Sequence, residues 1–285
     1  MEFKTTFDQR FDPQNGSVIY HYSTEFVLKS ICKNQELWLS DIYSMNDSSE
    51  FEWGRQLFVD VLKNNKNEFD QRFRFFIICS VMSAVPNTLP AIASFSKNGD
   101  LLSQWRAYAE DGMGYSIGFD SGAIYEGLGV NINSVVYDVK EQYNLVLSTL
   151  RGLHAMWKTK EENFETIQIP SQIFAIDLAY FKNPTFFEEQ EVRIIRLLVG
   201  ENEYFRDVGG NSEFNQSKPL QVLTRRKDED IIKYVKLPIK FKDSHIIKEI
   251  IIGPKNKKPI EEVEKQLFGL GLRGISIKRS KSTYR

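Results

Sequence analysis

Two carboxylates and an arginine follow one another at two-residue intervals in Glu189-Gln190-Glu191-Val192-Arg193. If this segment is a strand, the three charged side chains share one face and Val192 points to the other. Two carboxylates one pleat apart repel each other, which raises the pKa of one and prepares the pair for acid–base or electrostatic work. The alternative is a solvent-exposed strand whose glutamates pair with neighbouring lysines, which contributes little energy.

A histidine lies within a second polar segment, Tyr20-His21-Tyr22-Ser23. In a strand over this segment, His21 shares a face with Ile19, while Tyr20 and Tyr22 point to the other. An imidazole that faces a cleft can donate a hydrogen bond to a sugar hydroxyl and fix the orientation of the sugar. The alternative is a partly buried histidine whose ring is satisfied by the backbone.

Two further segments carry polar and aromatic side chains. Gln104-Trp105-Arg106-Ala107-Tyr108 fits one helical turn, in which Trp105 and Tyr108 share a face and Arg106 lies on another. The two rings could wall a flat ligand, and Arg106 could meet a pyrophosphate. Core packing is the simpler explanation for Trp105, and both readings of Arg106 stay open. Ser94-Phe95-Ser96, taken alone, is an ordinary amphipathic strand end.

These segments must be positioned by an irregular alternation of strands and helices. The sequence favours an α+β fold with a largely antiparallel sheet, because the regular crossover spacing of a parallel sheet is missing. We expect one domain over residues 1–285, with residues 1–16 as an N-terminal extension. Strands are expected over residues 18–23, 36–40, 75–81, 91–96, 115–119, 134–137, 187–198, 231–237, 247–252 and 275–278. Helices are expected over residues 25–33, from Asp47 onwards, from Asp100 to Tyr108, and over 140–165, 171–181 and 260–268.

The composition indicates a soluble, cytoplasmic protein. The 285 residues are 41% hydrophobic and 26% charged, and no apolar stretch reaches transmembrane length. The N-terminus has no signal-peptide pattern. Cys32 and Cys79 are too few for a disulfide framework or a cysteine zinc site, and the three histidines are scattered. We therefore expect no metal.

The near-neutral net charge conceals an asymmetry. Residues 218–285 contain 18 Lys and Arg against 8 Asp and Glu, a net of +10, whereas the preceding 217 residues have a net of −11. The basic C-terminal quarter could attract a polyanion. The alternative is a set of solvated faces that balance the acidic part of the same molecule.

The combined motifs resemble those of a large, uncharacterised bacterial domain family, from about Ser17 to Tyr284. The resemblance rests on Y-H-Y-S, on Met45-Asn46-Asp47 with Glu50, on S-F-S, on W-R-x-Y-A, on G-Y-S-I-G-F, on E-x-E-V-R and on the Ile275–Tyr284 stretch. That family is distantly similar to the ADP-ribosyltransferase-like superfamily. This similarity implies a split, mainly antiparallel β core with flanking helices that cleaves NAD as its substrate.

The resemblance assigns roles to the candidate residues. Glu191 matches the catalytic glutamate, which holds a ribose hydroxyl and stabilises the oxocarbenium-like charge as nicotinamide leaves. His21 would orient the ribose, and Glu189 would orient or deprotonate the acceptor. Ser94 and Ser96 would support the NAD site, together with Tyr22, Arg106 and Tyr108. The tyrosine that stacks on nicotinamide is left open among Tyr22, Tyr108 and Tyr115.

The expected function is therefore an NAD-dependent ADP-ribosyltransferase, acting as a bacterial toxin or anti-phage effector on a nucleic-acid or protein acceptor. An antitoxin partner is possible by the same resemblance. An NAD glycohydrolase and a non-catalytic nucleotide-binding module remain as alternatives. The chain has neither a GxGxxG motif nor a P-loop, which disfavours Rossmann-type dinucleotide binding and nucleoside triphosphate hydrolysis. It also lacks the nucleophile elbow of a serine hydrolase.

Overall fold

A computed structural model describes residues 11, 17–44, 49–160, 162–201, 204–211, 216–227, 230–241 and 244–284. The helices are α1 (Glu25–Asn34), α2 (Ser49–Asn64), α3 (Gln71–Asn87), α4 (Leu102–Tyr108), α5 (Ser121–Leu128), α6 (Val139–Thr159), α7 (Phe164–Asp177) and α8 (Ile260–Gly269), with 3₁₀ helices η2 (Ile42–Ser44), η3 (Glu110–Gly112), η4 (Leu178–Tyr180) and η5 (Pro184–Glu189). The strands are β1 (Val18–Ser23), β2 (Glu36–Asp41), β3 (Thr88–Ser96), β4 (Tyr115–Asp120), β5 (Asn131–Ser134), β6 (Glu191–Glu201), β7 (Tyr204–Asp207), β8 (Gly210–Asn211), β9 (Gln216–Ser217), β10 (Val222–Lys227), β11 (Asp230–Pro238), β12 (Lys240–Phe241), β13 (Ser244–His245), β14 (Ile247–Ile252) and β15 (Ser276–Arg279).

A large, open sheet organises the molecule. The strand order along the sheet is β10-β11-β2-β3-β1-β4-β14-β15. In addition, β6 pairs with β3, β5 and β7. The pairing of β14 with β15 is parallel, whereas the other named pairings in this sheet are antiparallel. The expectation of an α+β chain with a mainly antiparallel sheet is thus confirmed.

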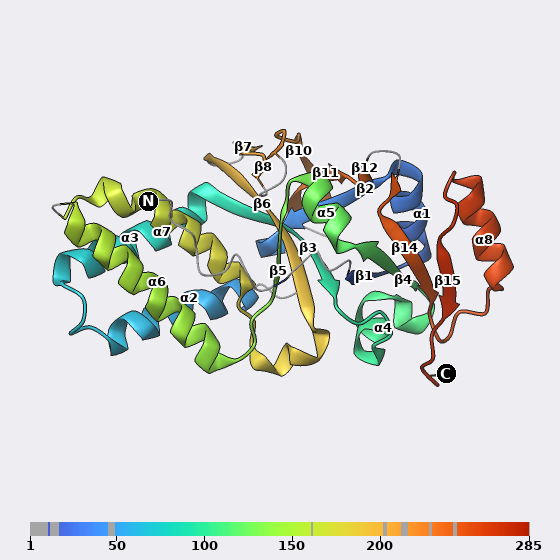
Figure 1. Cartoon of the computed structure of the whole chain (residues 1–285), viewed down its shortest axis with the longest axis horizontal. Helices are drawn as coiled ribbons and strands as arrows, with labels where there is room; N and C mark the ends of the chain where they lie inside the picture. Colours follow the sequence, from blue (N-terminus) through green and yellow to red (C-terminus); the bar gives the residue numbers. More distant parts are fainter. Residues whose placement is uncertain are drawn as a thin grey trace.

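Two large hydrophobic clusters lie at different places in the fold. One, which we call the sheet cluster, forms on a single face of the sheet, where side chains such as Leu39, Phe95 and Val192 pack with residues of α1, α5 and α8. The other consists mainly of residues from α2, α3, α6 and α7, including Phe58 and Trp157. These four helices gather at one end of the molecule, and α8 lies at the opposite end (Figure 1).

The strand expected over residues 75–81 is wrong, because this segment lies inside α3. The run Phe75-Phe76-Ile77-Ile78 is apolar on every side, so its hydrophobicity alone does not distinguish a strand from a buried helix. The deciding features are the N-cap Asp70, whose carboxylate accepts a hydrogen bond from the Phe73 amide at 2.8 Å, and packing against α7. Phe73, Ile77 and Val81 are buried at helical spacing.

The helical region after β5 also differs from the expectation. The helix expected over 140–165 is two helices, because α6 ends at Thr159 and α7 begins at Phe164 with Asn163 as its N-cap. The strand expected over 134–137 lies earlier, as β5. By contrast, β1 has the expected bounds, and α1 begins after Thr24, whose hydroxyl accepts from the Val27 amide at 3.2 Å.

Candidate functional site

A pocket of about 480 Å³ is lined from both faces of the sheet, because Ser94, Glu191 and Arg193 point away from the sheet cluster whereas Leu37 and Phe95 belong to it. Its walls come from β1, β2, β3, β6, β10 and β11, and from α1, α4 and η5. Of the residues that the sequence singled out, it brings together His21, Tyr22, Ser94, Tyr108, Glu189 and Glu191. Ser96 and Arg106 are not among the described residues that line it. The segments involved are distant in sequence, so only the sheet unites them.

Antiparallel register explains why these strands contribute side chains to one face. Ser94 lies opposite Arg193, and Ser96 lies opposite Glu191, in the pairing of β3 with β6. Residues directly opposite each other share a face in an antiparallel pair, and every second residue along a strand returns to it. Ser94, Glu191 and Arg193 therefore project to the same side, while Phe95 and Val192 enter the sheet cluster on the other.

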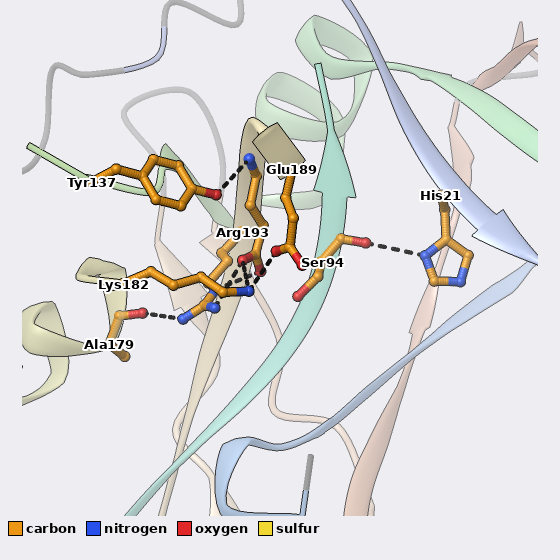
Figure 2. A network of polar contacts seen from close by, with 8 residues as sticks. His21, Ser94, Tyr137, Ala179, Lys182, Glu189 and Arg193 are labelled. Atoms are coloured by element: carbon orange, nitrogen blue, oxygen red, sulfur yellow. Dashed lines mark hydrogen bonds and ion pairs between the residues drawn. The ribbon is translucent and has the colours of Figure 1, made fainter. Parts of the chain in front are cut away.

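A network of four charged side chains contributes to the lining of the pocket (Figure 2). Arg193 donates to both carboxylate oxygens of Glu191, with Nε to Oε1 at 2.6 Å and Nη2 to Oε2 at 2.9 Å. The ammonium of Lys182 bridges the two glutamates, with 3.1 Å to Glu191 Oε2 and 2.5 Å to Glu189 Oε2. Two positive and two negative charges thus balance each other in a region with little solvent access.

The pKa of Glu191 is set by burial and by its cationic neighbours. Burial by itself raises the pKa of Glu191, but the charge and hydrogen bonds of Arg193, the charge of Lys182 and a hydrogen bond from Ser94 outweigh it. The pKa of Glu191 therefore falls from 4.5 to about 2. Repulsion from Glu189 does not prevail because Lys182 lies between the two carboxylates. Glu191 is ionised at neutral pH.

Glu189 does not occupy the strand position that the sequence predicts. It ends η5, and Gln190 follows in the left-handed conformation at φ 47°, so the strand begins only at Glu191. The two-residue period therefore does not extend from Glu191 back to Glu189. The side chain of Glu189 still reaches the network, because Lys182 precedes η5 and holds it there.

The ring of His21 lies where β1 and β3 separate. The two strands are paired at a single position, Tyr20 with Ser96, and the His21 ring contacts the backbone of β3 beyond it. His21 Nδ1 is 3.1 Å from the carbonyl oxygen of Ser94 (Figure 2). A carbonyl oxygen only accepts, so Nδ1 carries the proton. Burial lowers the pKa of His21 below 6.5 despite this hydrogen bond. The ring is therefore neutral at pH 7, and Nε2 is an acceptor rather than the donor that we expected.

The hydroxyls of Tyr22 and Ser96 form hydrogen bonds with backbone groups of the turn after β3. Tyr22 donates to the Asn98 carbonyl and accepts from the Leu101 amide, each at 2.8 Å. The Ser96 hydroxyl accepts from the Asn98 amide at 3.1 Å. Tyr22 reaches the pocket with its ring, whereas Ser96 lies outside the lining. Both residues therefore fix the backbone beside the pocket.

Helix α4 presents Tyr108 and Gln104 to the pocket. Tyr108 is 43% exposed, as suits a ring that covers a ligand. Trp105 is fully buried, packs edge-on against Tyr22, and donates Nε1 to Asp100 at 2.7 Å. Arg106 is exposed and lies 5.9 Å from the centre of the Tyr284 ring, outside the pocket. Of the three tyrosines considered for stacking, Tyr115 is buried in the sheet cluster.

Sequence reasoning missed Lys182 and Tyr137. The Tyr137 hydroxyl accepts from the Glu191 amide at 3.0 Å, which holds the start of β6 (Figure 2). Lys182 is 3% exposed, and a lysine is rarely buried without a partner. The apolar neighbours Tyr180 and Phe181 were a signal that Lys182 lies in the interior. The segment Met45-Asn46-Asp47 lies outside the described residues, and the side chain of Glu50 does too.

Two further observations concern the described ranges as a whole. They contain no group of three or more His, Cys, Asp or Glu side chains that could hold a metal ion. None of their helices combines the length and the apolar character needed to cross a membrane.

Comparison with known protein families gives a partial match, to a family without a known activity. Residues 104–194, about a third of the chain, match the model of a family described as "Protein of unknown function (DUF2971)". The matched segment begins in α4 and ends within β6, so it contains Lys182, Glu189, Glu191 and Arg193 but not His21. No curated protein and no solved structure matches the chain.

Proposed function

We propose that the pocket binds NAD and that the protein transfers ADP-ribose from NAD to a macromolecular acceptor. The observation that carries this proposal is the convergence of His21, Ser94 and Glu191 on one pocket. They come from β1, β3 and β6, which are neighbours in the sheet. They are also the residues that the sequence resemblance matched to the superfamily's NAD site.

The reaction breaks the bond between nicotinamide and C1′ of the adjoining ribose. The bonding electron pair leaves with nicotinamide and neutralises its ring nitrogen, and positive charge develops over C1′ and the ribose ring oxygen. A nucleophilic oxygen or nitrogen of the acceptor then forms a bond to C1′ and gives up its proton. A fixed carboxylate lowers the barrier because it attracts charge that exists only near the transition state.

Each residue of the pocket has a part in this scheme. Glu191, ionised through Arg193 and Lys182, is the carboxylate that faces the developing charge. The neutral His21 accepts a hydrogen bond from a ribose hydroxyl through Nε2. Tyr108 covers the nicotinamide ring. Glu189, close to Glu191 through Lys182, takes the proton of the acceptor.

A second function is a nucleotide-binding module without turnover. The observation in its favour is that both oxygens of Glu191 already accept hydrogen bonds from Arg193 and Lys182. Such a carboxylate has part of its charge neutralised, which reduces the stabilisation it can give to a cationic transition state. In this case the pocket binds NAD, or a related nucleotide, without cleaving it.

The test measures nicotinamide release from NAD labelled in its adenylate half, with and without RNA, DNA and cell lysate. We expect release by the wild type, transfer of label to a macromolecule, and loss of both in Glu191→Gln. Asp207→Asn is the matched control, because Asp207 is a buried, arginine-paired carboxylate outside the pocket. Free labelled ADP-ribose without a labelled macromolecule would identify a glycohydrolase. Binding of NAD without release would establish the binding module and contradict the transferase.

A further inference from the structure

A basic and aromatic strip continues the site face of the sheet beyond the charge network. We define it as Trp38 of β2, Tyr234 of β11, and Arg225 and Lys227 of β10. Register places these residues on one face, because Arg225 lies opposite Ile232, Tyr234 opposite Ser40, and Lys236 opposite Trp38. Ser40 in turn lies opposite Ile92, two residues before Ser94. The face is therefore continuous from β10 to Glu191 on β6.

The strip contains exposed aromatic surface with cations beside it. Trp38 is 40% exposed and stacks on Tyr234 with 4.6 Å between ring centres. The guanidinium of Arg225 lies 5.5 Å from the Trp38 ring centre and 5.8 Å from that of Tyr234. Phe26 of α1 lines the same pocket and is 80% exposed. Flat rings beside guanidinium groups are what unpaired bases require for stacking.

The two cations of the strip, Arg225 and Lys227, lie on the face of β10 that lines the pocket. Arg225, Arg226 and Lys227 are consecutive and exposed, but the alternation of β10 turns Arg226 to the opposite face, across from Ile231. Arg225 and Lys227 line the pocket, and Arg226 does not. Arg225 donates to the hydroxyl of Ser40 at 3.2 Å, a neutral partner. The nearby carboxylate Glu36 lies 3.8 Å from Lys236.

We propose that this strip binds single-stranded nucleic acid and is the acceptor subsite of the pocket. Arg225 and Lys227 contact backbone phosphates, and bases stack on Trp38 and Phe26. Four strand-to-strand steps of about 4.8 Å separate β10 from β6, roughly 19 Å, so one bound strand can reach from the strip to Glu191. A duplex keeps its bases paired and cannot stack them on Trp38. The role of the strip as an acceptor subsite beside Glu191 rests on the proposed function, whereas binding of a single nucleic-acid strand to the strip does not.

The test measures binding of fluorescein-labelled single-stranded RNA, single-stranded DNA and duplex DNA, without NAD, over a series of salt concentrations. We expect a single strand to bind better than the duplex, and the comparison of RNA with DNA identifies the sugar that is preferred. Arg225→Gln should reduce the slope of log K against log salt by about 0.7, and the double variant with Lys227→Gln by about 1.4. Trp38→Ala should weaken binding about 5- to 160-fold.

Arg226→Gln is the matched control, because it removes the same charge from the same strand on the other face. It should leave the slope and the affinity unchanged. Equal effects of Arg225→Gln and Arg226→Gln would overturn the proposal, and so would absence of single-strand binding, including the case in which label from NAD moves to protein alone. Glu191→Gln should bind the strand as the wild type does. Strand binding without NAD turnover would therefore support this inference and count against the proposed function.

Discussion

Strand β6 supplies the arginines of two buried arginine–carboxylate pairs, Arg193 with Glu191 and Arg196 with Asp207 of β7, and the pairs differ in what else binds the carboxylate. Asp207 accepts from Arg196 at 2.5 Å, from the Leu220 amide at 2.7 Å and from the Gly209 amide at 3.0 Å. Both side chains of this pair are fully buried, and neither lines the pocket. Backbone amides cannot leave without local unfolding, so this pair fixes the β6–β7 region and the loop that follows.

The carboxylate of Glu191 is held by side chains instead. Its partners are Arg193, Lys182 and Ser94, and all of them line the pocket. Side chains can change rotamers when a ligand brings competing groups, whereas the backbone of a paired strand cannot. Two ion pairs of similar chemistry, three residues apart, therefore serve different ends. Contact of the carboxylate with the pocket distinguishes the pair of Glu191 from the pair of Asp207.

The largest expected effect is on stability and comes from the pair outside the pocket. Asp207→Asn leaves Arg196 buried without a counter-charge, and its single NH2 group lies against the backbone amide of either Gly209 or Leu220. We expect the free energy of unfolding in urea to fall by about 3–5 kcal/mol. NAD affinity of the protein that remains folded should not change. A loss of NAD affinity at full stability would show that the two pairs are not functionally distinct.

The second prediction concerns catalysis by the pair at the pocket. Under the proposed function, Glu191→Gln removes the negative charge that faces the transition state, and we expect nicotinamide release to fall about 10²- to 10³-fold. Rates should be compared at equal folded fractions, determined by circular dichroism, since this variant also breaks a buried ion pair. Equal rates for Glu191→Gln and Asp207→Asn would contradict the distinction between the pairs.

The third prediction is a pH dependence of stability that belongs to Glu191. Its pKa is lowered from 4.5 to about 2, so its contribution is complete above pH 4.5 and is lost as the pH falls toward 2. The loss amounts to roughly 3 kcal/mol. Urea unfolding between these pH values should show this component in the wild type and in Asp207→Asn, but not in Glu191→Gln. Its presence in Glu191→Gln would assign the titration to another group.

The smallest expected effects come from the serines that support each pair. Ser94 donates to Glu191, and the Ser217 hydroxyl accepts from Arg196 at 2.5 Å. Ser94→Ala and Ser217→Ala should each lower the free energy of unfolding by about 1 kcal/mol. Calorimetric titration with NAD should show weaker binding only in Ser94→Ala. Weaker binding in Ser217→Ala would indicate that the pocket depends on both pairs.

The two pairs also show which features of the site could be predicted from the sequence. The pattern Glu191-Val192-Arg193 placed its charges on one face correctly, because that follows from the period of a strand. It misplaced Glu189, because the turn at Gln190 interrupts the period, and it did not indicate that the pKa of Glu191 is lowered. The cations that set this pKa include Lys182, which no strand pattern connects to Glu191. The single-domain interpretation and the roles assigned to individual site residues stay predictions.

The sequence by itself determined the α+β class, the bounds of β1, and the start of α1 at Glu25. Each of these follows from hydrophobic period and capping over a few neighbouring residues. Tertiary structure decided that residues 75–81 form a helix, that His21 is a neutral acceptor against the Ser94 carbonyl, and that Arg225 but not Arg226 faces the pocket. These outcomes depend on which distant segments pair and in what register, and on the burial that results, which local patterns do not encode.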